Sequence, residues 1–242
     1  MAYVRGNPAD YDGWAEQGNF GWSFNELLPY FKRSENHEQI DLMDSGYHSS
    51  SGELGVTIPD RFQTPFVDGF IEACAAIGIP KNLDYNGKIQ EGASLVQSTI
   101  KKGKRESGAT AFLKPALKRH NLTAITNARV DKIILEGKNA VGVQYKKGGK
   151  TIQVYGQKEI ILSAGTFKSP QLLMLSGIGE LSELKNHGIH CIHELKGVGK
   201  NLQDHLFYPI CAQSKTQEGI NPVSYTHLRA HETKAKRVCR RR

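Results

Sequence analysis

The sequence has no long hydrophobic run, and this absence removes one class of protein from consideration. No stretch approaches the roughly eighteen consecutive apolar residues that a membrane-spanning helix needs. The first twelve residues, MAYVRGNPADYD, also lack the apolar centre of a secretory signal peptide. We therefore expect no membrane span in this chain, and the localisation stays open.

Cysteines are few and widely spaced. The four are Cys74, Cys191, Cys211 and Cys239, and no two form a CxxC pair. Structural zinc sites and the disulfide frameworks of small secreted domains both need closely patterned cysteines. The pattern indicates neither, and we expect no metal site.

Acidic and basic residues are nearly balanced over most of the chain. The formal net charge of the 242 residues is +8, but the segment from Val223 onward holds seven Lys/Arg and one Glu. The rest keeps 25 of the 32 basic and 23 of the 24 acidic residues, a net charge of only +2. Without its last segment, the chain lacks the basic surplus typical of nucleic-acid-binding proteins, so we expect no nucleic-acid partner.

Residues 223–242 differ from the preceding chain in composition, because they are strongly basic. Residues 223–233, VSYTHLRAHET, back-translate codon by codon into a transposon-end adapter used in short-read sequencing libraries. We expect 223–242 to be a non-native tail that does not fold. The alternative is a non-catalytic short product that acts as a binding or interaction protein through this basic tail.

Helices are predicted in the first half of the chain. SFNELLPYFKRSEN has Ser23 as a candidate N-cap and cations at its end. TPFVDGFIEACAAIGI begins after Thr64, has an apolar stripe and ends at Gly78. A third helix, in GKRESGATAFLKPAL, is expected to bend or end at Pro115. The stripe of the second helix comprises Phe66, Phe70, Ile71 and Cys74.

Strands are predicted in the second half. LTAIT, ARVDKIILEG, AVGVQYKKGG, TIQVYG and KEIILSAG are short, rich in β-branched residues and separated by Gly, Asn or Lys turns. Helices followed by a meander of strands indicate an α/β fold with α+β character.

The most informative segment is KEIILSAGTFKSPQLLMLSGIG, residues 158–179. Three apolar residues are expected to form a buried strand, and three small residues follow. Ser169 is the expected N-cap of a helix whose first residue is Pro170 and which ends at Gly177. Ligands of α/β folds bind at the carboxyl ends of strands, and helix N-termini favour anions. The segment is consistent with one edge of a nucleotide site and equally with a plain strand–helix junction.

Residues 165–179, GTFKSPQLLMLSGIG, resemble the second signature of the glucose-methanol-choline (GMC) oxidoreductases, flavoenzymes that oxidise alcohols and sugars. MAYVRGNPADYDGWA, LTAITNARVDKI and GVGKNLQDH resemble further segments of that family in the same order. The resemblance implies an incomplete FAD-binding domain of GMC type plus part of a substrate-binding domain. It divides the chain into a covering segment (1–36), a substrate-side region (37–120), part of the FAD-binding domain (121–222) and the tail (223–242).

The resemblance also implies a cofactor, FAD, and the residues near it. The backbone of Val130 is expected to meet the adenine, and Ala164 and Gly165 to lie near the dinucleotide. The substrate is expected to be a small alcohol or sugar, and the electron acceptor, oxygen or a quinone, stays open.

Three further residues, Asn201, Asp204 and His205, are expected on the active-site side, with Asp204–His205 more typical of a structural pair than of an acid–base dyad. Trp14 and Trp22 are expected to be core or covering aromatics rather than substrate contacts.

Two elements that such chemistry needs are not found. No GxGxxG turn is present, because the GxG tripeptides at Gly177 and Gly197 lack the third glycine and neither is expected to open a helix after a strand. In the family that turn precedes the first signature, within which this chain starts, and the proton-abstracting histidine comes from a later segment. We therefore expect an internal fragment that is inactive alone, and we name no catalytic base.

Overall fold

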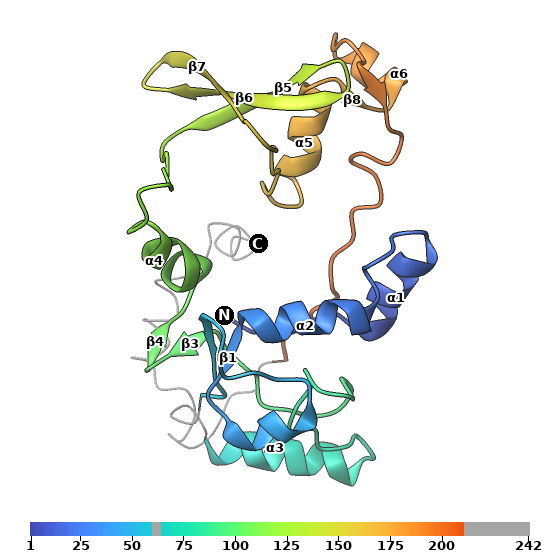
Figure 1. Ribbon diagram of the computed structural model, residues 1–242. Coiled ribbons are helices and arrows are strands. Elements are labelled where there is room, and N and C mark those ends of the chain that lie inside the picture. The colour runs from blue at the N-terminus through green and yellow to red at the C-terminus, as the bar shows by residue number, and fades with distance from the viewer. Residues whose placement is uncertain (60–63, 211–242) are drawn as a thin grey trace, which may run out of the picture. The chain divides into compact units, whose positions relative to one another are not determined.

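The computed structural model describes residues 1–59 and 64–210, which form two compact units (Figure 1). The first unit runs from Met1 to Leu122 and the second from Thr123 to Ile210. The tail from Val223 lies outside the described residues. Within them, every helix is too short or too polar to span a bilayer.

The first unit is built from short helices and short strands. Its helices are α1 (Pro8–Glu16), α2 (Phe24–Ser34), the 3-10 turn η1 (Ile40–Ser45), α3 (Pro65–Ala76), the π-turn η3 (Ala109–Leu113) and α4 (Lys114–Ala116). Its strands are the parallel pair β1 (Glu35–His37) and β2 (Leu54–Val56) and the hairpin β3 (Ile100–Lys101) and β4 (Lys104–Arg105).

Helix α2 begins as its sequence predicts. Ser23 is the N-cap, and the Glu26 carboxylate accepts hydrogen bonds from the Ser23 amide and hydroxyl. The bond from the Ser23 amide to Glu26 satisfies a backbone donor at the start of the helix. Lys32 and Arg33 lie in the last turn, where the helix dipole favours cations.

The other two expected helices differ in detail from their predictions. In α3, Thr64 is the N-cap and Cys74 is buried, but the Phe66 and Phe70 side chains are 46% and 65% exposed. The helix therefore carries the expected apolar stripe, but the described residues leave the Phe66 and Phe70 side chains of this stripe partly uncovered. The third helix is irregular around Pro115: the π-turn η3 gives way to α4 at Lys114, and α4 ends at Ala116, one residue after the proline.

The second unit is a three-stranded antiparallel sheet with helices. The sheet has the order β5 (Arg129–Glu136), β6 (Asn139–Lys147) and β7 (Lys150–Tyr155), which confirms the predicted meander for these strands. Helices α5 (Lys168–Leu175) and α6 (Leu181–Asn186) and the parallel pair β8 (Ile178–Gly179) and β9 (His193–Glu194) follow. The core of this unit contains Ile133, Tyr145, Leu172 and Leu184.

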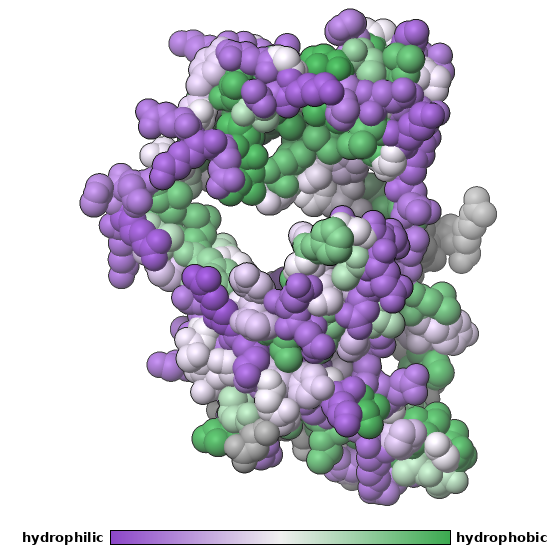
Figure 2. Space-filling model, turned by 45° about the vertical axis from the view of Figure 1, so that its right-hand side comes forward, coloured by the Kyte–Doolittle hydropathy of each residue, from purple (hydrophilic) through white to green (hydrophobic). Residues whose placement is uncertain are grey.

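Two predicted strands are not formed. LTAIT has no regular structure, and residues 158–165 run without pairing to any described strand. Ile161, in the middle of the second segment, is 78% exposed. The sequence has strand character there, but a strand needs a neighbour to satisfy its backbone and cover its side chains. Hydrophobic residues also lie at the surface of the molecule elsewhere (Figure 2).

Candidate functional site

The turn before α5 holds two of the expected cofactor residues, Ala164 and Gly165. Gly165 has φ +87°, a left-handed conformation that favours glycine, and a Cβ built on it would meet no atom within 4 Å. Backbone geometry rather than crowding therefore requires glycine here. The neighbouring Ser163 and Ala164 are exposed, so the turn presents open backbone to solvent.

Ser169 stabilises this turn in a way that the sequence did not predict. Helix α5 begins at Lys168, two residues earlier than expected, so Ser169 and Pro170 lie in its first turn and Phe167, not Ser169, is the N-cap. The Ala164 amide donates to Ser169 Oγ at 3.1 Å, and the Ser169 amide donates to the Gly165 carbonyl at 2.9 Å. Pro170 is tolerated because first-turn amides have no partner within a helix.

Val130, the third expected cofactor residue, lies in β5 opposite Tyr145. The register shifts between Val130 and Lys132, which marks a local irregularity of the β5–β6 ladder. Among the described strands β5 is at the edge of its sheet, so some of its backbone groups point away from β6. Val130 is therefore placed on a strand with free hydrogen-bonding positions.

A buried hydroxyl joins β5 to α5. Ser176, just after α5, accepts a hydrogen bond from the Ile133 amide at 2.8 Å and donates to the Leu172 carbonyl. Ser176 and Leu172 are buried, and α5 packs against β5. The elements that carry Val130 and the Ala164–Gly165 turn are thus parts of one packed unit.

The residues expected on the active-site side lie in an irregular, exposed segment. Asn201 has a left-handed backbone, and the His205 amide donates to the Asp204 carboxylate at 2.9 Å. That contact involves the backbone of His205, so the structure forms no imidazole–carboxylate dyad there. The structure does not bring these residues together with Val130 or Gly165 into one pocket.

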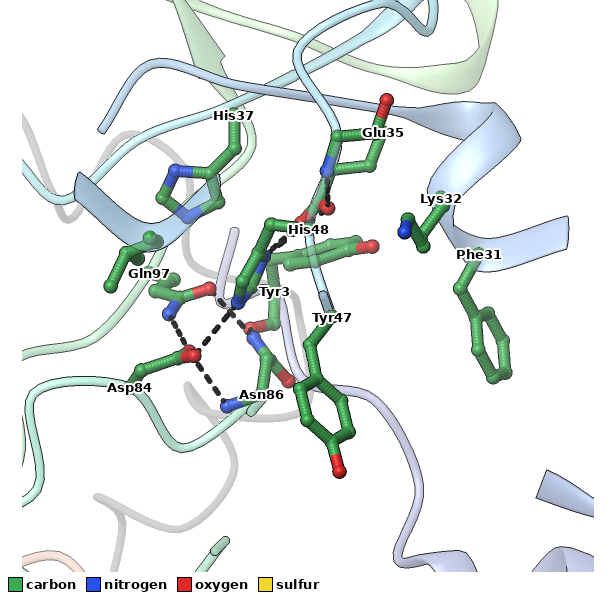
Figure 3. Close-up of polar contacts among 12 residues, drawn as sticks. Tyr3, Phe31, Lys32, Glu35, His37, Tyr47, His48, Asp84, Asn86 and Gln97 are labelled. Atoms are coloured by element: carbon green, nitrogen blue, oxygen red, sulfur yellow. Dashed lines mark hydrogen bonds and ion pairs between the residues drawn. The ribbon is translucent and has the colours of Figure 1, made fainter. Parts of the chain in front are cut away.

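The first unit contains a buried ion network that no local sequence pattern indicates (Figure 3). Glu35, fully buried at the start of β1, contacts the Arg5 guanidinium at 2.8 Å. His48 bridges two carboxylates, with Nδ1 3.1 Å from Glu35 and Nε2 2.9 Å from Asp84. Two side-chain amides complete the network. Asn86 Nδ2 donates to Gln97 Oε1, and Gln97 Nε2 donates to the Asp84 carboxylate.

Protonation of His48 holds the network together. Burial disfavours the imidazolium, but the hydrogen bonds and charges of Asp84 and Glu35 outweigh burial and raise the pKa of His48 to about 9. Burial also opposes ionisation of Asp84, and the hydrogen bond from His48 overcomes it and lowers the pKa of Asp84. At neutral pH the network therefore contains a cation between two anions.

Glu35, His37 and His48 lie close enough together to suggest a metal centre. However, both His48 nitrogens are engaged by carboxylates, and His37 Nδ1 accepts the Gln39 amide at 3.2 Å. This assigns the proton of neutral His37 to Nε2, a buried atom without a hydrogen-bond partner among the described residues. The hydrogen bonding thus describes an ion network rather than a set of free metal ligands.

Comparison with known proteins gives the family. The family profile described as GMC oxidoreductase matches residues 1–207. The chain belongs to the GMC oxidoreductase family. The sequence-based recognition of this family and of a mixed α/β fold is confirmed.

Its relatives include two choline dehydrogenases. The chain is 46% identical over 206 residues to human mitochondrial choline dehydrogenase, covering 85% of this chain and 34% of that protein. It is 45% identical over 207 residues to the oxygen-dependent choline dehydrogenase of Photobacterium profundum, covering 85% of this chain and 36% of that protein. The chain therefore spans about a third of the length of these relatives.

Solved structures show the same fold. Pyridoxine 4-oxidase from Mesorbium loti matches with a TM-score of 0.78 and 34% identity, covering 85% of this chain and 40% of that one. Formate oxidase matches with a TM-score of 0.75 and 28% identity, covering 85% and 36%. An FAD-dependent oxidoreductase from Chaetomium thermophilum matches with a TM-score of 0.72 and 32% identity, covering 84% and 37%.

Proposed function

We propose that this chain is part of an FAD-dependent enzyme that oxidises the CH–OH group of a small alcohol or sugar, and that a choline-type alcohol is the first substrate to test. The observation that carries the proposal is the exposed Ser163–Gly165 turn at the start of α5, inside the matched region. The electron acceptor, oxygen or a quinone, stays open.

The residues of the turn fit an FAD phosphate chain. Gly165 provides a left-handed backbone with open space beside it, and Ala164 adds little bulk. The Ser169 amide already donates to the Gly165 carbonyl and Pro170 has no amide hydrogen, so it is mainly the helix dipole that makes this end of α5 favourable for anions. Bound FAD would supply the acceptor for a hydride from the substrate carbon.

Val130 fits a contact to the adenine. Its strand is at the edge of the described sheet, so backbone groups can serve a ligand in place of another strand. Such a contact depends on the main chain and not on the valine side chain. We propose that residues 121–222 belong to the FAD-binding domain, 37–120 to a substrate-side region and 1–36 to a covering segment.

A chimera tests the proposal. Residues 1–207 of this chain would replace the matching region of the Photobacterium profundum choline dehydrogenase. We expect the purified chimera to show a flavin absorbance spectrum and to reduce a dye in the presence of choline. A Gly165→Val version is the control and should bind less flavin, because valine disfavours a left-handed backbone. A folded chimera without flavin would contradict the proposal.

A further inference from the structure

Ser169 ties helix α5 back to the turn that precedes it. Its Oγ accepts a hydrogen bond from the Ala164 amide at 3.1 Å, and its own amide donates to the Gly165 carbonyl at 2.9 Å. These two bonds close a ring over residues 164–169, and Gly165 lies inside the ring in its left-handed conformation. The N-cap of α5, Phe167, has no polar side-chain group that could hold the turn instead.

The helix that carries Ser169 is anchored in the core of its unit. Leu172, three positions further along α5, is buried, and Ser176 just after the helix accepts a hydrogen bond from the Ile133 amide of β5. A turn that is hydrogen-bonded to a packed helix is held in one conformation before a ligand arrives. Binding to such a turn therefore costs less conformational entropy than binding to a loose one.

Three consecutive amides in this ring are free within the part of the chain that the structure describes. Gly165, Thr166 and Phe167 donate no hydrogen bond to any described residue. Successive backbone amides in a turn form a concave group of donors that suits an anion. The diphosphate of FAD presents anionic oxygens of this kind, so the free amides fit the cofactor that the proposed function requires.

We propose that Ser169 is a positioning residue for the diphosphate of FAD. Its hydroxyl holds the turn at Ala164 and Gly165, so that the amides of residues 165–167 stay available to the phosphate oxygens. The proposal rests on the proposed function, because it takes the turn to be part of the FAD site. Alanine at position 169 would leave the Ala164 amide without its acceptor, whereas threonine would keep the hydroxyl.

The test uses the same choline dehydrogenase chimera, from which the flavin is removed and to which FAD is then added back. Ser169→Ala should raise the dissociation constant of FAD by about three- to tenfold, the effect of one hydrogen bond. Ser169→Thr should stay within about twofold of the unmodified chimera, because the hydroxyl is kept. Ser182→Ala is the matched control: it removes an exposed hydroxyl that donates to Glu180, and it should leave FAD binding unchanged.

Phosphorus NMR separates a positioning role from a general loss of structure. The phosphate resonances of bound FAD report the surroundings of the diphosphate, and the flavin absorbance spectrum reports the surroundings of the ring. We expect Ser169→Ala to shift at least one phosphate resonance while the absorbance spectrum stays unchanged, and Ser169→Thr to restore that resonance. A change of the absorbance spectrum together with the phosphate resonances would mean a general loss of structure and would overturn the proposal.

Amide hydrogen exchange gives a measurement that needs neither a variant nor flavin. In the unmodified 242-residue chain, the Ala164 amide should exchange more slowly than those of Gly165 and Thr166, because only Ala164 has an acceptor. Equal exchange at the three amides would overturn the proposal.

The chimera distinguishes failure of this proposal from failure of the proposed function. A Ser169→Ala chimera with the same FAD dissociation constant and phosphate resonances as the unmodified one would overturn the role of Ser169 and leave the proposed function standing. A folded, unmodified chimera without flavin would contradict the proposed function, and the role of Ser169 with it.

Discussion

A single proton on His48 is expected to stabilise the first unit. The folded-state pKa of about 9 is above the ordinary value of 6.5, so the stabilisation is complete below pH 6.5 and is lost as the pH rises through 9. The shift corresponds to about 3 kcal/mol of unfolding free energy. Urea unfolding followed by tryptophan fluorescence should show this loss between pH 6.5 and 9, since both tryptophans lie in this unit.

Substitution of His48 tests the same network at constant pH. His48→Gln leaves Glu35 and Asp84 without their shared cation and should cost about 3 kcal/mol or more at pH 7. The variant should also lose most of the pH dependence between 6.5 and 9. His187→Gln, an exposed histidine of the second unit, is the control. Equal pH profiles for His48→Gln and the unmodified chain would contradict the assignment of the proton.

Gly165 gives a second test at the scale of one residue. Gly165→Ala should lower the unfolding free energy by about 1 kcal/mol, because alanine resists a left-handed backbone. Gly13→Ala is the contrasting variant: it lies inside α1, its Cβ would meet no neighbour, and alanine should stabilise that helix by about 0.5 to 1 kcal/mol. Thermal unfolding of the two variants should therefore shift in opposite directions.

At the scale of elements, one buried hydroxyl, that of Ser176, hydrogen-bonds β5 to the end of α5. Ser176→Ala removes the acceptor of the buried Ile133 amide and should cost about 1 to 3 kcal/mol. Ser182→Ala removes an exposed hydroxyl that contacts Glu180 and should cost less than about 0.5 kcal/mol. Amide hydrogen exchange at Ile133 provides the local measurement. Unchanged protection of this amide in Ser176→Ala would show that another group holds the two elements together.

Elements were predictable from sequence where their determinants are local. Ser23 marks the start of α2 through its own neighbours, and the β5–β7 meander follows from β-branched runs and short turns. The ion network was not predictable, because Glu35, His48 and Asp84 come together only through tertiary structure. The segment 158–165 has the composition of a strand, yet its pairing depends on a partner that the described residues do not provide. Composition therefore predicts the tendency of a segment to form a strand, but the strand forms only where another strand pairs with it.

At the scale of the whole molecule, the 242-residue chain alone is expected neither to retain FAD nor to oxidise alcohols. The turn at Gly165 and the backbone of Val130 offer only part of a dinucleotide site, and the sequence contains no GxGxxG turn to hold the pyrophosphate. No residue of the chain is assigned as the base that takes the hydroxyl proton, a contribution of about 10²- to 10⁴-fold in rate.

Exposed apolar residues lead to the same expectation. Ile161 in the unpaired segment and Leu206 and Phe207 near the end of the described chain are largely open to solvent, which favours aggregation over a stable holoprotein. The measurement is the flavin absorbance of the soluble chain after incubation with excess FAD, followed by dye reduction with choline, glucose and simple alcohols. The choline dehydrogenase chimera is the positive control. A yellow one-to-one complex of the chain alone that turned over any of these substrates would show that residues 1–242 already contain a complete site, because neither a missing pyrophosphate turn nor a missing base could then be limiting.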